Sequence, residues 1–129
     1  MDSDVLVVDD SAAIRKILQR VLRQTGMAIR TIHEAGDGEE AIHLLGRQQV
    51  DLVLTDINMP KMDGLQLLAT IKASPEWRNI PVVMITTEGG EVKVAEAVKL
   101  GAAGYVRKPF TADQIKEKLV GIVEPALPL

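Results

Sequence analysis

The sequence predicts an α/β protein in which a five-stranded parallel sheet is flanked by five helices. Short apolar runs alternate along the chain with longer segments whose apolar residues recur at helical spacing. A helix that joins two parallel strands crosses over with a right hand, so repeated units of this kind build one sheet covered on both faces. The 129 residues, 47% of them hydrophobic, suit one domain. We expect this domain at residues 1–124 and a tail at 125–129, where two prolines cannot continue a helix.

The first strand, Asp4–Val8, is a nearly continuous apolar run, which is typical of a strand buried on both faces of a sheet. Ser11 or Asp10 can cap the helix that follows, because either side chain offers an oxygen to the free backbone amides of a first turn. The apolar residues of this helix keep their spacing until a break near Gly26. Ile29–Ala35 mixes polar and apolar residues, as expected of an edge strand.

The central strand is predicted at Val50–Thr55, a second nearly continuous apolar run. Before it, the turn Gly36–Gly38 leads into a short helix that we expect to extend to about Gln48. After it comes a loop from Asp56, in which Asp63–Gly64 is most simply interpreted as a turn.

The third helix is predicted to stop before Ser74–Pro75, because the residue that precedes a proline avoids the helical conformation. Val82–Thr86 is another apolar run and is predicted as the fourth strand. A helix from about Glu91 should end before Gly101. The short fifth strand, Gly104–Arg107, then leads to a last helix that places apolar residues at Ile115, Leu119, Ile122 and Val123.

Several strands lead directly into polar residues: Asp9 and Asp10 after the first, Asp56 after the central one, Thr86 at the end of the fourth and Lys108 after the fifth. The carboxyl ends of parallel strands meet at one edge of the sheet, which is where ligands bind. Three neighbouring carboxylates repel one another unless a cation lies among them. Oxygen ligands alone favour a hard ion, and few protein ligands suit Mg²⁺ better than Ca²⁺. A metal, a lysine and a hydroxyl around Asp56 could stabilise a phosphoryl group on its carboxylate.

The same residues belong to segments that occur in the order and spacing of a known family. These segments are Val7–Asp10, Asp56 with Met59–Pro60 and Asp63–Gly64, Thr86, Tyr105, and Lys108–Phe110. On them the chain resembles a response regulator receiver domain, over nearly its whole length. Within this family, the chain most resembles the stand-alone chemotaxis response regulators, on the evidence of Asn58, Glu88 and Gly104–Ala112. The resemblance implies their flavodoxin-like, CheY-like fold with strand order 2-1-3-4-5.

The resemblance also implies a chemistry for the acidic residues. Asp56 would accept a phosphoryl group from a histidine kinase. Asp10 and Asp56 would ligate Mg²⁺ through their carboxylates and Asn58 through its backbone carbonyl. Asp9 would assist directly or through a water molecule.

A conformational switch is the second implication of the resemblance. Lys108 and Thr86 would bind the phosphoryl oxygens, so that Thr86 moves inward and Tyr105 follows from an outward to a buried rotamer. The Lys108–Pro109 peptide bond would be cis. The fourth helix, fifth strand and fifth helix would form the surface for a downstream protein partner. The chain would then be a two-component signalling switch, of the single-domain chemotaxis type, and not a conventional turnover enzyme.

Some residues depart from the pattern of the chemotaxis regulators. Ile57 stands where an aromatic residue is usual, and Thr87, where a smaller residue is usual, would narrow access to the acyl phosphate. Gly89–Gly90 replaces a more basic stretch, which weakens the expectation of a flagellar-motor partner. Asn58 and Glu88 are placed to touch an attacking water molecule, so the phosphoryl lifetime stays open.

Four other functions are compatible with parts of the pattern. The chain could pass phosphate on to a histidine phosphotransfer protein in a phosphorelay, or it could be the receiver unit of a larger regulator. A Mg²⁺-dependent phosphatase with an aspartyl phosphate is disfavoured, because Asn58 stands where a second Asp is needed and no cap insertion is present. A flavin carrier is disfavoured because the segment after the first strand, Asp9–Ser11, is acidic and lacks a phosphate-binding cradle.

Composition excludes further classes. The net charge of −3 and the scarcity of aromatic residues give no basis for direct binding to nucleic acid. No apolar run approaches the length of a membrane span and the first residues are acidic, so we expect a cytoplasmic protein without membrane insertion. The absence of cysteine excludes disulfides and thiolate metal sites. His33 and His43 are expected to be solvated and to take no part in the chemistry.

Overall fold

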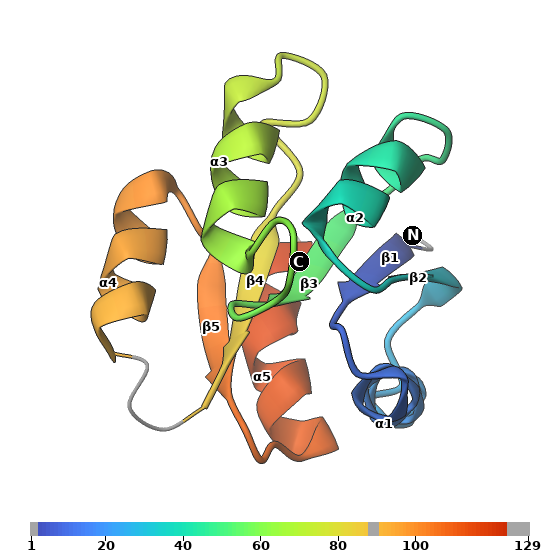
Figure 1. Cartoon of the computed structure of the whole chain (residues 1–129). Coiled ribbons are helices and arrows are strands. Elements are labelled where there is room, and N and C mark those ends of the chain that lie inside the picture. The colour runs from blue at the N-terminus through green and yellow to red at the C-terminus, as the bar shows by residue number, and fades with distance from the viewer. Residues whose placement is uncertain (1–2, 88–90, 124–129) are drawn as a thin grey trace.

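The computed structural model describes residues 3–87 and 91–123 of the chain. The predicted tail at 125–129 and the loop residues Glu88, Gly89 and Gly90 lie outside the described residues. In the described part five strands form a single sheet in the order β2-β1-β3-β4-β5, and all neighbouring pairs are parallel (Figure 1). The predicted strand order is therefore confirmed. The strands are β1 (Ser3–Val8), β2 (Ile29–Ala35), β3 (Leu52–Asp56), β4 (Val82–Thr86) and β5 (Gly104–Arg107).

Five helices cover the two faces of this sheet (Figure 1). Helices α1 (Ala12–Gln24) and α5 (Ala112–Val123) pack against each other on one face. Helices α2 (Gly38–Leu45), α3 (Gly64–Ala73) and α4 (Glu91–Leu100) cover the other face, with α3 between its two neighbours. The predicted α/β class is thus confirmed. No helix among the described residues is long and apolar enough to cross a membrane.

The core is divided by the sheet into two apolar layers. Alternate residues of a strand point to opposite faces, so Leu6 and Val8 of β1 pack under α2 and α3, whereas Val5 and Val7 pack under α1 and α5. All six residues of β1 are buried, as are all five of β4. Strands held on both faces and both edges have little freedom to move, so the residues at their carboxyl ends are presented in fixed positions.

Two predicted boundaries are wrong by a few residues. Strand β3 begins at Leu52 and ends at Asp56 instead of covering Val50–Thr55. Its start is displaced because Asp51 lies at the entry to the sheet, where its backbone N–H donates to the carbonyl oxygen of Asp4 (2.7 Å) and its carboxylate accepts from the Asp4 amide (2.8 Å). Asp56 is consequently the last residue of the strand and not the first of a loop.

Helix α2 ends at Leu45, three residues before the predicted limit of Gln48. The amide of Gly46 bonds to the carbonyl of Ile42, and the amide of Gln48 bonds back to the carbonyl of Leu44 (2.8 Å), which closes the helix in a turn. Leu45 is also the last buried residue of the helix. Residues 46–49, which follow it, are exposed and carry no apolar side chain, so nothing favours a further helical turn.

The interpretation of Asp63–Gly64 as a turn is wrong, because these residues open α3. Asp63 is the N-cap: its carboxylate accepts from the Gln66 amide (2.9 Å) while the Gln66 side chain accepts from the Asp63 amide (3.0 Å). Gly64 lies against the end of β3, and its amide donates to the carbonyl of Ile57 (2.7 Å). A Cβ atom on Gly64 would lie 2.2 Å from the backbone oxygen of Asp56. Glycine is required here by this close approach.

We expect Gly64→Ala to destabilise the fold by about 1–3 kcal/mol, because the new methyl group must displace backbone that cannot easily yield. Gly121→Ala in α5 is the matched control, since a Cβ atom there has no neighbour within 4 Å. That control should leave stability unchanged or raise it by up to about 1 kcal/mol, as alanine favours a helix. Urea unfolding of both variants measures the difference; equal midpoints would contradict the close approach at Gly64.

Candidate functional site

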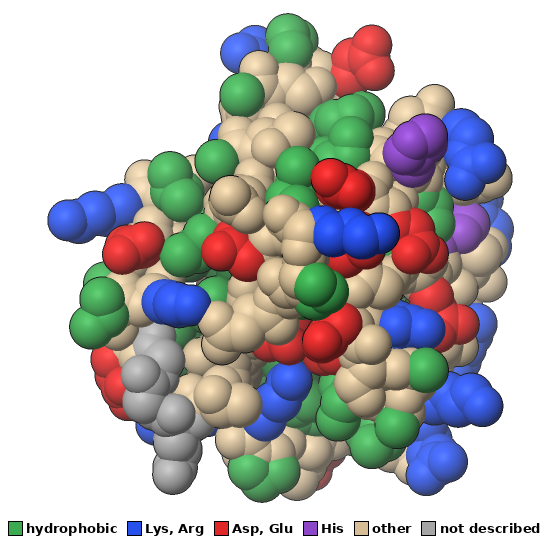
Figure 2. All heavy atoms as spheres, in the orientation of Figure 1, with side chains coloured by type: hydrophobic (Ala, Val, Ile, Leu, Met, Phe, Trp, Pro, Cys, Tyr) green, Lys and Arg blue, Asp and Glu red, His purple; other side chains and the backbone are tan. Residues whose placement is uncertain are grey.

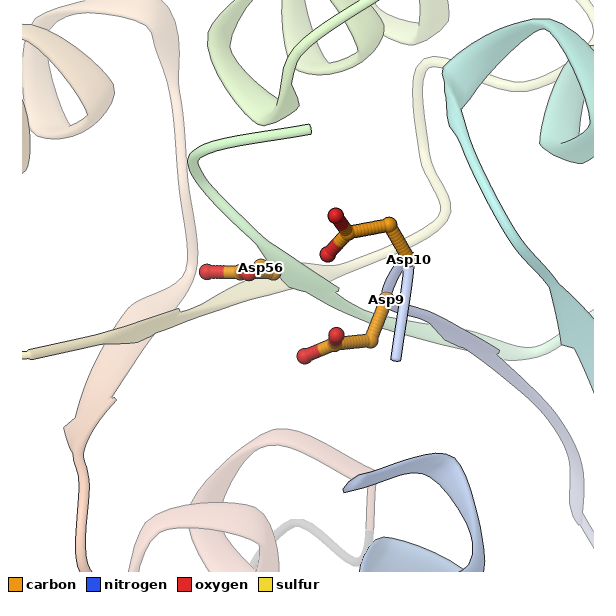
Figure 3. A group of neighbouring side chains, drawn as sticks. All are labelled: Asp9, Asp10 and Asp56. Atoms are coloured by element: carbon orange, nitrogen blue, oxygen red, sulfur yellow. The ribbon is translucent and has the colours of Figure 1, made fainter. Parts of the chain in front are cut away.

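The acidic residues converge because β1 and β3 are adjacent and parallel. Val8, the last residue of β1, is paired with Thr55, so Asp9 leaves β1 beside the point where Asp56 ends β3. One carboxylate oxygen from each of Asp9, Asp10 and Asp56 lies within 4.8 Å of the others. In Figure 3, Asp9 and Asp10 diverge from the end of β1 and both lean toward Asp56. The predicted cluster of three acids is therefore present at this edge of the sheet.

Asp9 is the most firmly held of the three. Asp9 is 2% exposed, and its backbone amide donates to the carbonyl of Ala35 (3.1 Å). Its Oδ1 atom accepts from the Ser11 amide (2.9 Å), and its backbone oxygen accepts from Nη1 of Arg15 (2.6 Å). The backbone of Asp9 is thus bonded to β2 and α1, and its carboxylate is bonded to the amide of the cap residue Ser11.

Lys108 lies between two of the acids. Its Nζ atom is 3.3 Å from Oδ2 of Asp9 and 3.7 Å from Oδ2 of Asp56. The chain brings it there from β5, where its backbone amide bonds to the carbonyl of Thr86 (2.6 Å). The Lys108–Pro109 peptide bond is cis, as the resemblance implies. The lysine thus bridges the ends of three strands by charge and by hydrogen bonding.

Burial raises the pKa of the Asp56 carboxyl above its ordinary value. The Lys108 ammonium opposes that rise in the pKa, and the negative charge of Asp9 adds to it. The backbone amides of Ile57 and Asn58 donate to the Asp56 carboxylate and favour its charged form, the first at 2.8 Å from Oδ1. Asp56 is therefore a half-buried carboxylate with a cation on one side and two amides on the other.

The donor set fits a hard divalent cation. It consists of oxygen atoms from three carboxylates, with no sulfur ligand in the chain, and such ligands are those that Mg²⁺ prefers. The spread of 4.8 Å is slightly larger than the separation of about 4.2 Å between opposite oxygens around a bound Mg²⁺ ion, whose metal–oxygen distances are about 2.1 Å. Asp10 is exposed, so water can complete the coordination shell.

The other predicted site residues lie at the margin of this cluster. Thr86 ends β4 and is 4% exposed; its hydroxyl donates to the carbonyl of Thr87 (3.2 Å). Tyr105 on β5 is 37% exposed, in the outward position that the resemblance implies, with Nζ of Lys118 5.3 Å from the ring centroid. The side chain of Asn58 faces α4, where Oδ1 accepts from Nζ of Lys93 (2.6 Å). In the described part of the chain, the hydroxyl and the ring thus have other partners than the three acids.

Comparison with known proteins agrees with this arrangement. The family model of the response regulator receiver domain matches residues 5–120. The chain belongs to this family. The curated chemotaxis protein CheY-3 of Vibrio cholerae is 42% identical to it over 120 residues, which are 93% of this chain and 91% of that protein.

Solved structures of receiver domains have the same fold. The chemotaxis response regulator CheY4 of Vibrio cholerae superimposes with a TM-score of 0.81 at 30% identity, over 92% of this chain and 97% of that one. The receiver domain of NtrX from Brucella abortus gives 0.77 at 33% identity, over 92% and 99%. Receiver domains are signalling proteins and not conventional enzymes, generally bind Mg²⁺, and interact with histidine kinases and downstream targets.

Three residues that support the site of this receiver domain are not predicted from the sequence. Arg15 bonds both to the backbone of Asp9 and to Glu34 on β2, with Nε 3.0 Å from the Glu34 carboxylate. Lys93 reaches Asn58 from α4, and Gly64 packs against the end of β3. Arg15 and Lys93 lie on helix surfaces where charged residues are common, so the sequence carries no signal for them. Gly64 could have been found by asking why a glycine follows a helix cap.

The raised pKa of Asp56 predicts that the charged carboxylate destabilises the fold when no metal is bound. A carboxyl group whose pKa is higher in the folded than in the unfolded state lowers the free energy of unfolding at pH values above its folded-state pKa. This loss of stability disappears as the pH falls through the folded-state pKa toward the unfolded-state pKa. Asp56→Asn should therefore raise the Tm by a few degrees at pH 7 in EDTA, and the gain should shrink toward pH 4. Thermal melts across this pH range measure it.

Glu76→Gln is the control for that measurement. Glu76 is exposed in the loop after α3, and the substitution removes the same formal charge as Asp56→Asn. It should change the Tm little at any pH. A gain for Asp56→Asn that is absent at pH 7, or that grows as the pH falls, would contradict the assigned direction of the Asp56 pKa.

Proposed function

We propose that this receiver domain accepts a phosphoryl group on Asp56 from a histidine kinase and then presents an altered surface to a protein partner. The observation that supports this most directly is the placement of Asp56, half-buried at the end of the central strand, 3.7 Å from the Lys108 ammonium and within reach of two further carboxylates. A carboxylate in such surroundings suits the role of a nucleophile whose product carries additional negative charge.

In the proposed reaction a carboxylate oxygen of Asp56 attacks the phosphorus of a phosphohistidine, the phosphorus–nitrogen bond breaks, and the imidazole leaves with the bonding electrons. Lys108 holds a phosphoryl oxygen through its ammonium, and the Thr86 hydroxyl turns inward to hold another. Asp10 and Asp56 would bind Mg²⁺ through carboxylates, Asn58 through its backbone carbonyl, and Asp9 directly or through water. When bound, Mg²⁺ offsets the negative charge that gathers on the transferring group.

The switch that we propose connects Thr86 to Tyr105. Thr86 ends β4 and Tyr105 lies on the adjacent β5, where it is paired with Met84. Movement of the threonine hydroxyl toward the phosphoryl group would vacate space beside β5, and the Tyr105 ring would move into it from its outward position. Tyr105 lies on β5, which follows α4 and precedes α5 in the chain. Movement of its ring would alter the surface that both helices share with β5.

The proposed partner surface consists of α4, β5 and α5. Apolar side chains are unusually exposed on α4, among them Val92 (74%), Val98 (57%) and Leu100 (41%). Figure 2 shows apolar side chains along the left edge of the molecule, where α4 lies in Figure 1, interspersed with basic and acidic ones. An apolar surface of this kind suits a protein partner.

The chemotaxis type of regulator is the pathway that we favour, because the curated relatives include CheY-3 at 42% identity over 93% of the chain. Residues 1–124 would form the whole receiver unit. The transferred phosphate originates from ATP, so the function requires a cytoplasmic location. Self-dephosphorylation would return the domain to its resting state without making it a conventional enzyme.

A second candidate is a receiver unit of a larger regulator or an intermediate in a phosphorelay. The similarity to the receiver domain of NtrX at 33% identity supports it. In this case the phosphoryl group would pass from Asp56 to a histidine phosphotransfer protein or alter a neighbouring domain. Transfer of phosphate from the loaded protein to a histidine on an isolated phosphotransfer domain distinguishes this role from a pure binding switch.

Acetyl phosphate tests the proposed function directly. In the presence of Mg²⁺ the intact protein should gain the mass of one phosphoryl group, measured by mass spectrometry. The gain should be absent in Asp56→Asn and strongly reduced in EDTA. Failure of the wild-type protein to gain mass, or an equal gain in Asp56→Asn, would contradict the assignment of the acceptor.

The proposed switch can be followed at Tyr105 itself, because it is the only tyrosine of the chain. Protein labelled with 3-fluorotyrosine should show a ¹⁹F resonance whose solvent isotope shift falls on phosphorylation, as the ring becomes buried. Thr86→Ala should be phosphorylated without this change. Thr70→Ala is the control, since it removes a hydroxyl that bonds within α3 (2.8 Å to the carbonyl of Gln66). An unchanged response in Thr86→Ala would remove the threonine from the switch.

A further inference from the structure

A lysine on α4 contacts the loop that follows the acceptor strand. The Nζ atom of Lys93 lies 2.6 Å from Oδ1 of Asn58, across 35 residues of sequence. A hydrogen bond from an ammonium group to an amide oxygen is charge-assisted and therefore stronger than one between neutral groups. It joins the first turn of α4 to the residue two positions after Asp56.

This contact has few competitors in holding α4. Ala97 is the only buried residue of that helix, so its apolar packing against the sheet is slight. Within the described residues, the first turn has one other polar side-chain contact, an exposed ion pair between Glu91 and Arg107 at 3.4 Å, and one partly buried apolar side chain, that of Val94. Figure 1 shows α4 at one end of the row of three helices on its face of the sheet. A weakly packed helix responds to the loss or gain of a single polar contact.

Asn58 occupies the solvent side of the acceptor carboxylate. Its backbone amide donates to Asp56, and its side chain is exposed. The opposite side of Asp56 faces Lys108 and Asp9. On this exposed side, the amide oxygen of Asn58 uses one of its two lone pairs to accept a hydrogen bond from Lys93.

We propose that Lys93 is a positioning residue that governs the lifetime of the phosphoryl group and connects the acceptor loop to α4. The inference rests on the proposed function of Asp56. In hydrolysis a water oxygen bonds to phosphorus, the bond from phosphorus to the Asp56 oxygen breaks with its electrons left on the carboxylate, and the water proton passes to the released phosphate. By bonding to Oδ1 of Asn58, Lys93 fixes the direction of that amide and takes one of the two lone pairs with which it could accept a hydrogen bond from the attacking water.

The charge of Lys93 acts in the same direction. An acyl phosphate on Asp56 brings nearly two negative charges to the loop, and the Lys93 ammonium contacts this loop 2.6 Å from Oδ1 of Asn58. The attraction stabilises the phosphorylated state and draws the first turn of α4 toward the loop. A change of charge at Asp56 is thereby transmitted to the helix through one side chain.

The first experiment compares Lys93→Met with Lys99→Met. Both changes remove one positive charge from α4, but Lys99 lies in the last turn of the helix, and the structure gives it no ion pair or side-chain hydrogen bond among the described residues. After loading with acetyl phosphate and Mg²⁺, the phosphoryl group should be lost at least threefold faster from Lys93→Met than from the wild type. Lys99→Met should decay at the wild-type rate, and Lys93→Arg should stay within twofold of it.

A double mutant tests whether Lys93 acts through Asn58. If it does, Lys93→Met should accelerate the decay much less in an Asn58→Ala background than in the wild type. An equal acceleration in both backgrounds would overturn the role of the amide, and an equal decay of Lys93→Met and Lys99→Met would overturn the proposal as a whole.

A measurement on the unphosphorylated protein separates this inference from the proposed function. Hydrogen exchange of the Ala95 and Glu96 amides, which belong to the first hydrogen-bonded turn of α4, should quicken in Lys93→Met and not in Lys99→Met. Absence of any phosphoryl gain in the wild type would overturn the proposed function and with it the effect on lifetime. Unchanged exchange in Lys93→Met would overturn the connection to α4 even if Asp56 is phosphorylated normally.

Discussion

The ammonium group of Lys108 is the interaction on which the site depends. It lies 3.3 Å from one acid and 3.7 Å from another, at an edge where three carboxylates share a small volume. Without a cation these groups would repel one another and favour protonation or displacement. The lysine lets the carboxylates of Asp9 and Asp56 stay close while leaving the outer side of the cluster open to a metal ion. The rest of the fold holds these side chains in fixed positions relative to one another.

The two-layered core fixes the positions of the strands that carry the acids. Strand β1 is buried along its whole length and pairs with β2 and β3 on its two sides, so the backbone that carries Asp9 is held from four directions. Asp56 is held by the last pairing of β3 with β4 and by the close approach of Gly64. Rigid strands with charged ends give a site whose geometry changes little, so a response to phosphate has to come from elements packed less tightly.

Helix α4 is such an element. It buries one residue and exposes several apolar side chains, and its first turn is held by polar contacts to the acceptor loop and to β5. The same helix forms part of the surface that we propose for the partner. A rigid chemical centre beside a weakly held helix is a physical basis for a switch, because a small change in charge can shift the helix without disturbing the sheet.

The sequence by itself determined the α/β class, the five strands and helices and the acids at one edge, because the hydrophobic pattern and the right-handed crossover leave few other arrangements. The motif resemblance then added the strand order, the cis bond before Pro109 and the family. These signals lie in short segments whose type can be interpreted without knowing which distant residues they contact.

Only the tertiary structure decided what depends on contacts between distant residues. The start of β3 follows from the pairing of Asp51 with Asp4, and the role of Gly64 follows from its contact with the backbone of Asp56. The links of Arg15 to Asp9 and of Lys93 to Asn58 join segments that no periodic pattern relates. A charged residue on a helix surface has the same sequence signature whether it points to solvent or to a neighbouring loop, and only the packing of the elements distinguishes the two.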